Sequence, residues 1–315
     1  MPEFETDVLG APYTVETIDL PADSEGAVEA TLVKRAAAAP TDKAVLHVHG
    51  FADYFFQTEY AEWWNARGYD FYAIDLRKYG RSIRDHQTVN YVADIREYFT
   101  ELDEAWSRVA ERDAHGHVVL SAHSTGGLTV PLWANERKHV LAGMVLNSPW
   151  FDMQGPLWLR TLGSQVVKQI GARRPMQAIP RNVSGLYVRS LHKDHEGEWE
   201  FDLGWKPVES WPVYAGWLAA IRNAHDELHR GLDIRCPVLV LTSGATVYPR
   251  EMSEEVHGHD IVLEVQQIRR WSSAVGKHVT LVSIDGAVHD VTLSRDPVRK
   301  QVYLELERFM DGYVD

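Results

Sequence analysis

The segment AHSTG at 122–126 places a serine between an apolar run and an apolar segment with helical character. Small residues two positions before and two positions after a serine are typical of a sharp strand-to-helix turn that exposes a nucleophile. The usual pattern begins with glycine, and Ala122 meets the same steric demand. Serine, threonine and glycine are also common loop residues, so the motif alone fits an ordinary connection equally well. Ser124 is therefore a candidate nucleophile that needs partners elsewhere in the chain.

A serine hydroxyl becomes a useful nucleophile only when a base removes its proton. The chain has 15 histidines, and His289 stands out because GAVHD follows the last predicted strand and precedes the final predicted helix. A carboxylate must then orient this imidazole and stabilise the imidazolium. Asp260, in the loop beyond the strand PVLVLTS, is the main candidate, and Asp152 is the alternative. Asp290 is adjacent to His289 in sequence, and we expect it to point elsewhere.

Hydrolysis through a tetrahedral intermediate also requires backbone N–H groups that bind the oxyanion. Thr125 follows the candidate nucleophile, so its N–H is one predicted donor. The segment HVHGF supplies the other, the N–H of Phe51, with Gly50 allowing close approach. The same His-Gly pair also fits a plain turn at the end of a strand. His49 and Asp75 are further polar residues at predicted strand ends.

The elements that must position these residues alternate along the chain. Six short apolar, β-branched runs predict strands at 44–50, 69–76, 117–124, 141–149, 237–244 and 278–286. Apolar residues spaced by three and four predict a helix over 92–109, and weaker patterns predict helices over 58–67, 126–138, 264–275 and 298–310. This alternation predicts an α/β domain with a mostly parallel sheet, in which ligands bind beyond the carboxyl ends of the strands. The earlier segments TVETIDL and AVEATLVKR alternate in polarity and predict an antiparallel edge.

The alternation stops between about 150 and 231, a region that holds six of the 11 tryptophans. An insertion that interrupts a sheet and then lets it resume predicts a cap. We therefore expect a core domain formed by 1–149 and 232–315 and an aromatic-rich cap formed by 150–231. The aromatic side chains could line a hydrophobic cleft or attach the cap to the core, and both interpretations remain open.

Composition excludes several classes of function. The net charge of −13 disfavours binding to nucleic acid and to anionic membrane surfaces. No apolar run approaches the roughly 20 residues of a membrane span, and the acidic first ten residues do not resemble a signal peptide. We therefore expect a cytoplasmic protein with no transmembrane segment. The single cysteine, Cys236, excludes an intrachain disulfide and is predicted to be a buried, inert thiol.

Two histidine-containing motifs suggest a metal. HDELH at 225–229 resembles the H-E-x-x-H zinc motif with Asp226 in place of glutamate. A solvated helix of the cap is the favoured interpretation of this segment. HGHD at 257–260 is better explained as the loop that carries the acid. The chain has neither nucleotide-binding glycine fingerprint, so we expect no metal and no cofactor.

Taken in order, HVHGFADY, EYAEWWNARGYDFYAIDLRKYGRS, SAHSTGG, HDIVLEV and GAVHD resemble the monoacylglycerol lipase and lysophospholipase branch of the α/β-hydrolase superfamily, of the serine aminopeptidase S33 type. The resemblance covers about 44–149 and 236–310. In this family the second strand ends in D-x-R-G-x-G-x-S, and here Lys78 replaces the first of those glycines. The resemblance implies an α/β-hydrolase fold with a cap inserted after the sixth strand.

It also implies a serine hydrolase that cleaves carboxylic esters, with a triad of Ser124, His289 and Asp260. The cap does not match visibly, so the substrate is not implied. Its aromatic content suggests a small-molecule ester with an apolar acyl group. The same triad could cleave amide or carbon–carbon bonds, and a non-catalytic binding protein on the same fold is a further alternative. An aspartate nucleophile is disfavoured because Ser124 occupies the turn.

Overall fold

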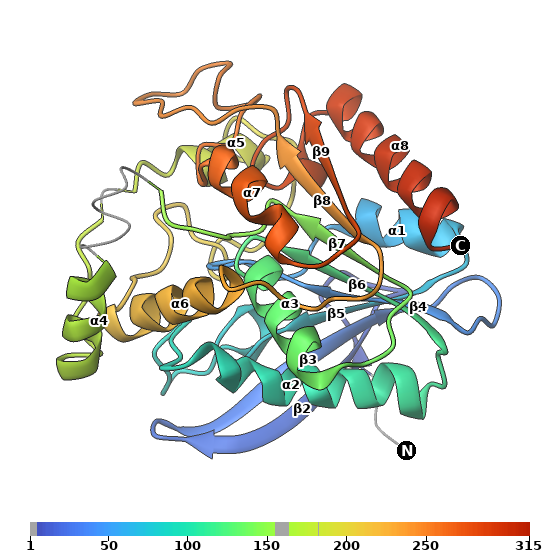
Figure 1. Ribbon diagram of the computed structural model, residues 1–315, viewed down its shortest axis with the longest axis horizontal. Coiled ribbons are helices and arrows are strands. Elements are labelled where there is room, and N and C mark those ends of the chain that lie inside the picture. The colour runs from blue at the N-terminus through green and yellow to red at the C-terminus, as the bar shows by residue number, and fades with distance from the viewer. Residues whose placement is uncertain (1–4, 155–163, 182) are drawn as a thin grey trace.

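The computed structural model describes residues 5–154, 164–181 and 183–315. These residues form a nine-stranded sheet with the order β1-β2-β3-β5-β4-β6-β7-β8-β9 (Figure 1). Its parallel part consists of β4 (Lys43–Val48), β5 (Asp70–Asp75), β6 (His117–His123), β7 (Gly143–Asn147), β8 (Val238–Ser243) and β9 (Val279–Ile284). β1 (Glu5–Thr6), β2 (Thr14–Asp23) and β3 (Gly26–Arg35) add an antiparallel edge. The predicted strands and the predicted antiparallel edge are therefore confirmed.

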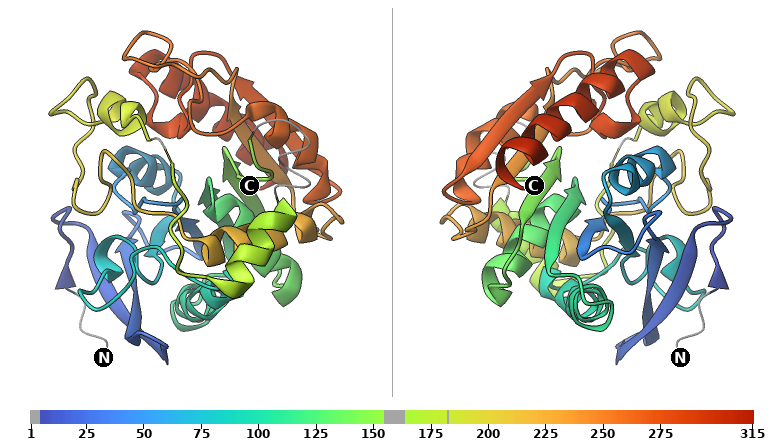
Figure 2. Two further views of the ribbon diagram at one scale, coloured as in Figure 1. Left: turned by 90° about the vertical axis from the view of Figure 1, so that its left-hand side faces the viewer. Right: turned by 90° about the vertical axis from the view of Figure 1, so that its right-hand side faces the viewer.

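Helices cover both faces of the sheet (Figures 1 and 2). α1 (Thr58–Ala66) and α8 (Asp296–Tyr313) lie on one face, and α2 (Tyr98–Trp106), α3 (Gly126–Arg137) and α7 (Val265–Trp271) lie on the other. Alternate residues of each strand supply the two cores. In β4, for example, Leu46 and Val48 face the α2–α3 side, whereas Val45 faces the α1–α8 side. Among the described helices, none is both long and apolar enough to cross a bilayer.

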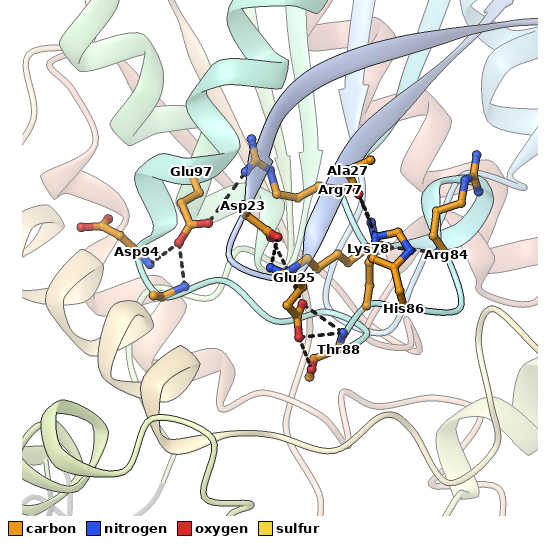
Figure 3. Close-up of polar contacts among 12 residues, drawn as sticks. Asp23, Glu25, Ala27, Arg77, Lys78, Arg84, His86, Thr88, Asp94 and Glu97 are labelled. Carbon is orange, nitrogen blue, oxygen red and sulfur yellow. Dashed lines mark hydrogen bonds and ion pairs between the residues drawn. The ribbon is translucent and has the colours of Figure 1, made fainter.

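The predicted helix over 92–109 is present in three pieces. A 3₁₀ turn (Ile95–Glu97) leads into α2, and a π-helical turn (Ser107–Arg112) follows it. Asp94 caps the start, because its carboxylate accepts the N–H of Arg96 while Glu97 accepts the N–H of Asp94 (Figure 3). Further 3₁₀ turns occur at Gly80–Ser82, Ser272–Ala274 and Val291–Leu293.

The segment 150–231, which the sequence predicts to be a cap, lies between β7 and β8, and its described residues add no strand to the nine-stranded sheet. β7 is the seventh strand in chain order, and the sixth when the two-residue β1 is set aside. The helices of this segment are α4 (Ser164–Arg173), α5 (Leu186–Leu191) and α6 (Ala215–Leu228). α6 lies between α4 and α3 and so joins the cap to the core. Trp158, which contributes to the aromatic count of the cap, lies outside the described residues.

Lys78, which stands in place of the family's glycine, has a left-handed backbone with φ +65°. Such a conformation costs a non-glycine residue about 1–2 kcal/mol. The Lys78 Nζ lies 2.6 Å from a carboxylate oxygen of Asp23 and 2.6 Å from one of Glu25, at the turn of the β2–β3 hairpin (Figure 3). Glu25 also accepts hydrogen bonds from the N–H and hydroxyl of Thr88. The strained lysine is thereby one of several links between the hairpin and the loop that follows β5.

Candidate active site

Ser124 lies on the turn between β6 and α3, and its φ is +53°. Its N–H donates to the carbonyl of Asn147 at 3.0 Å, and its carbonyl accepts the N–H of Trp150 at 2.9 Å. These bonds tie the turn to the neighbouring β7 connection. A Cβ on Gly126 would lie 2.6 Å from the Val48 carbonyl oxygen, so no larger residue fits there. The tight strand-to-helix turn that the sequence predicted is present.

His289 and Asp260 reach Ser124 from the loops after β9 and β8. Ser124 Oγ lies 3.1 Å from His289 Nε2, and His289 Nδ1 lies 2.8 Å from Asp260 Oδ2. The other carboxylate oxygen of Asp260 accepts the N–H groups of Val262 and Leu263 at 2.8 and 2.7 Å. Because Nδ1 donates to the carboxylate, the lone pair of Nε2 faces the serine hydroxyl. The three side chains are buried and form one continuous chain of hydrogen bonds.

The two other carboxylates considered from the sequence have different partners. Asp152 accepts a hydrogen bond from Arg222 of the cap at 2.9 Å. Asp290 accepts hydrogen bonds from Asn147 at 2.6 Å and from Gln57 at 3.1 Å. Asp260 is thus the carboxylate that hydrogen-bonds the His289 ring, and Asp290 points away from it.

The two predicted oxyanion donors lie beside Ser124. A Cβ on Gly50 would lie 2.9 Å from the Ser124 Cβ, which places the loop after β4 directly against the serine. Phe51 is the next residue of this loop, and Thr125 follows Ser124. Neither the Phe51 nor the Thr125 N–H donates to an acceptor within the described part of the chain. Because buried N–H groups are usually paired, two free donors beside a serine indicate a place for an anionic oxygen.

A cavity of about 530 Å³ opens onto Ser124 and His289. Trp150 and Trp217 of the cap line it together with Phe51, and the Phe51 and Trp217 ring centroids are 4.4 Å apart. Trp205 instead packs against Tyr54, with centroids 5.1 Å apart, outside the cavity lining. Trp150 and Trp217 therefore line the cavity, whereas Trp205 packs against the core. Each of the two interpretations, a hydrophobic cleft and attachment of the cap, thus accounts for part of these residues.

His49 and Asp75 stabilise loops and do not line the cavity. His49 Nδ1 donates to the Gly50 carbonyl at 2.7 Å, and its Nε2 accepts the N–H of Leu76 at 3.1 Å. Burial lowers the pKa of His49 and keeps it neutral. The Asp75 carboxylate accepts hydrogen bonds from the backbone N–H and side chain of Arg81. Both residues thus hold the ends of their strands in place.

The sequence analysis missed a buried ion pair beside the loop that carries Phe51. Lys206 of the cap lies 2.7 Å from Asp53, and the two residues are 4% and 2% exposed. Burial is the largest single effect and would raise the pKa of Asp53, but the charge and hydrogen bond of Lys206, together with smaller effects of neighbouring groups, lower that pKa to about 2. The partners are 153 positions apart, so neither has a local sequence pattern that signals the contact.

The cap also contacts the loop that carries the histidine. The hydroxyl of Tyr187 accepts the N–H of Asp290 at 3.0 Å, directly after His289. On the other side, the hydroxyl of Tyr54 accepts the N–H of Asp202 at 2.6 Å. The cap is therefore hydrogen-bonded to the loops on both sides of Ser124.

The interpretation of 225–229 as a solvated helix was wrong in part. His225 is fully buried, because α6 lies between α3 and α4. His225 and His229 each hold a backbone carbonyl, those of Trp150 and Phe151, at 2.8 and 2.7 Å. Within residues 5–154, 164–181 and 183–315, no group of three His, Cys, Asp or Glu side chains is arranged to hold a metal ion.

A mostly parallel sheet with a serine after β6, an acid after β8 and a histidine after β9 defines the α/β-hydrolase fold. Comparison with protein families then identifies the family within this fold. The profile described as "Serine aminopeptidase, S33" matches residues 39–296, and the chain belongs to this family. A search of curated proteins found no match.

Solved structures with the same fold include lipases and esterases. A monoacylglycerol lipase from Paleococcus ferrophilus has a TM-score of 0.64 at 19% identity, over 89% of this chain and 98% of the lipase. A soluble variant of monoglyceride lipase from Saccharomyces cerevisiae has a TM-score of 0.64 at 16% identity, over 94% and 95%. A thermophilic esterase from Thermogutta terrifontis has a TM-score of 0.59 at 16% identity, over 95% and 100%. At these identities the likeness establishes the fold.

Proposed function

We propose that the protein is a serine hydrolase that cleaves carboxylic esters through an acyl-enzyme on Ser124. The observation that carries this proposal is the hydrogen-bonded chain from Asp260 through His289 to Ser124, at the floor of the cavity. We also propose that 150–231 acts as the cap of a core made of 1–149 and 232–315. The expectation of a cytoplasmic enzyme is retained from the sequence.

In the first half of the reaction, Ser124 Oγ attacks the ester carbonyl while His289 Nε2 takes its proton. Asp260 stabilises the imidazolium, and the N–H groups of Val262 and Leu263 hold its carboxylate in position. The N–H groups of Phe51 and Thr125 bind the oxyanion. His289 then protonates the leaving alcohol, and a water molecule repeats the sequence to release the acid.

Two observations support an ester with an apolar acyl group. The aromatic rings of Phe51, Trp150 and Trp217 line the cavity next to Ser124. The structural relatives named above include lipases and an esterase. The family description names an aminopeptidase, and the same triad can hydrolyse amides, so amide cleavage is the second candidate.

Labelling with a fluorophosphonate tests the proposal. We expect an adduct on Ser124 that is lost in Ser124→Ala and retained in Ser107→Ala, since Ser107 follows α2 and is not among the described residues that line the cavity. Matched p-nitrophenyl esters and p-nitroanilides then separate esterase from amidase activity. The Ser124→Ala variant should lose about 10⁴-fold or more in kcat. A folded wild-type protein that is neither labelled nor active on any of these compounds would contradict the proposal and favour a binding protein.

A further inference from the structure

Arg181 of the cap lines the cavity that contains Ser124. Its guanidinium carbon lies 5.7 Å from the centroid of the Phe51 ring, on the loop that supplies a proposed oxyanion donor. One of its terminal nitrogens donates to the carbonyl of Trp211 at 2.8 Å. These contacts fix the direction of the side chain, but neither partner carries a negative charge.

The charges in the cavity do not balance. Apart from histidines, the described lining has three charged side chains, namely Asp53, Arg181 and Lys206. Lys206 and Asp53 neutralise each other at 2.7 Å. His123 is kept neutral, because burial lowers its pKa. Among the residues that the structure describes, no carboxylate lies within 4.0 Å of Arg181, so the cavity has one uncompensated positive charge in a chain of net charge −13.

Arg181 lines the cavity while its side chain remains exposed to solvent. The apolar lining of the cavity includes Ile179, Val183 and Val208, and the guanidinium lies over the ring of Phe51. Partial burial lowers the pKa of Arg181, and no neighbouring carboxylate opposes that effect. An exposed guanidinium beside an aromatic ring, with no carboxylate partner among the described residues, is free to form charge-assisted hydrogen bonds with an anion that enters the cavity.

We propose that Arg181 binds an anionic group at the end of the substrate that lies away from the scissile ester. The substrate class is then an amphiphilic anion, with an apolar segment across the aromatic wall and a carboxylate or a phosphate monoester on Arg181. The planar guanidinium suits both groups, since each can accept two parallel hydrogen bonds. This inference rests on the proposed ester hydrolysis at Ser124 and specifies its substrate.

The test compares esters that differ only in terminal charge. The probes are p-nitrophenyl esters of long-chain acids that end in a carboxylate, in a phosphate monoester or in a neutral carboxamide, over a series of chain lengths. We expect the wild type to prefer a charged ester at one optimal length. Arg181→Gln should lower the ratio of kcat/KM for that ester to kcat/KM for the carboxamide ester by about tenfold to a hundredfold, mainly through the KM of the charged ester.

Two further variants serve as controls. Arg181→Lys keeps the charge and should retain part of the preference. Arg174→Gln removes an exposed cap arginine outside the cavity lining and should change kcat/KM for neither the charged nor the carboxamide ester. A wild type that hydrolyses charged and neutral esters equally, with no effect of Arg181→Gln, overturns the proposal and leaves the hydrolase assignment intact. If Arg181→Gln lowers kcat/KM for both the carboxylate ester and the phosphate ester, the site is a general anion site. If it lowers kcat/KM for only one of them, the site is assigned to that group.

Binding to Ser124→Ala tests the site without turnover. Calorimetric titration should show tighter binding of the charged ester than of the carboxamide ester, and adding Arg181→Gln should remove the difference. If the wild type turns over neither ester but this difference persists, the proposed reaction fails and the anion site stands. If the two esters bind equally, the anion site fails.

Discussion

Lys78 has two opposing effects on stability, because its ammonium stabilises the hairpin turn whereas its left-handed backbone is strained. Replacing Lys78 with methionine removes the first effect and keeps the second. The variant keeps a side chain on a left-handed backbone and removes the ammonium that lies 2.6 Å from both Asp23 and Glu25. The two carboxylates at the hairpin turn then face each other and an apolar group without a cation. We expect a loss of stability with no change in the geometry around Ser124.

The size of the loss follows from burial. Breaking a fully buried ion pair costs about 3–5 kcal/mol. The side chains of Asp23 and Glu25 are 16% and 23% exposed, so water screens part of that cost and we expect about 2 kcal/mol. For a chain of 315 residues this corresponds to a fall in Tm of about 3 °C. Lys78→Gly also relieves the backbone strain and should be less destabilised than Lys78→Met by about 0.5–1 kcal/mol.

The loss should also depend on pH. Burial is the largest single effect and would raise the pKa values of Asp23 and Glu25, but the hydrogen bonds and charge of Lys78, together with backbone and Thr88 hydrogen bonds, lower both. A carboxylate with a lowered pKa in the folded state stabilises the protein above its unfolded pKa, and this contribution disappears as the pH falls through the folded value. The difference between the wild type and Lys78→Met should therefore be full at pH 7 and shrink below about pH 4.

Urea denaturation followed by circular dichroism at pH 7 and pH 3.5 measures these differences. A Lys78→Met variant as stable as the wild type at pH 7 would refute the reasoning. An equal loss at both pH values would refute it as well, because the loss would then come from packing and not from charge.

Three other predictions concern the loops around Ser124. Asp260→Asn should lower kcat by about 10⁴-fold with little change in KM, measured with a p-nitrophenyl ester, because the His289 tautomer is no longer fixed; a loss below tenfold would exclude Asp260 as the acid. Gly50→Ala places a Cβ 2.9 Å from that of Ser124 and should slow fluorophosphonate labelling at least 100-fold while the protein stays folded. Lys206→Met leaves Asp53 buried without a partner and should lower the free energy of unfolding by about 3 kcal/mol, whereas Lys206→Met with Asp53→Leu should recover most of it.

The fold could be predicted from the sequence because each strand has two covered faces. Residues of β4 alternate between the two cores, so the run AVLHV is apolar except for His47 and was recognised as a buried parallel strand. The helix over 92–109 was also recognised, because its apolar residues face one core. Its division into 3₁₀, α and π turns depends on local hydrogen bonds that apolar spacing does not report.

The site could be predicted only where local chain geometry determines it. Ser124 lies in a turn with its own sequence pattern, and His289 follows the last strand. The choice between Asp260 and Asp152 required coordinates, because both follow strands whose ends meet at the same edge of the sheet. Arg181 was not singled out at all, since its significance depends on which charges surround it in space.

The bonds from the cap to both loops have a mechanical consequence. Segment 199–206 holds the Phe51 side of the reaction centre through Tyr54 and Asp53, and Tyr187 holds the His289 side through the Asp290 amide. The same contacts therefore hold together the segment that we propose to bind the substrate and the loops that carry the reacting groups. An evolutionary change of substrate through remodelling of this insertion would have to preserve these anchor points, and its freedom to vary lies in the side chains between them.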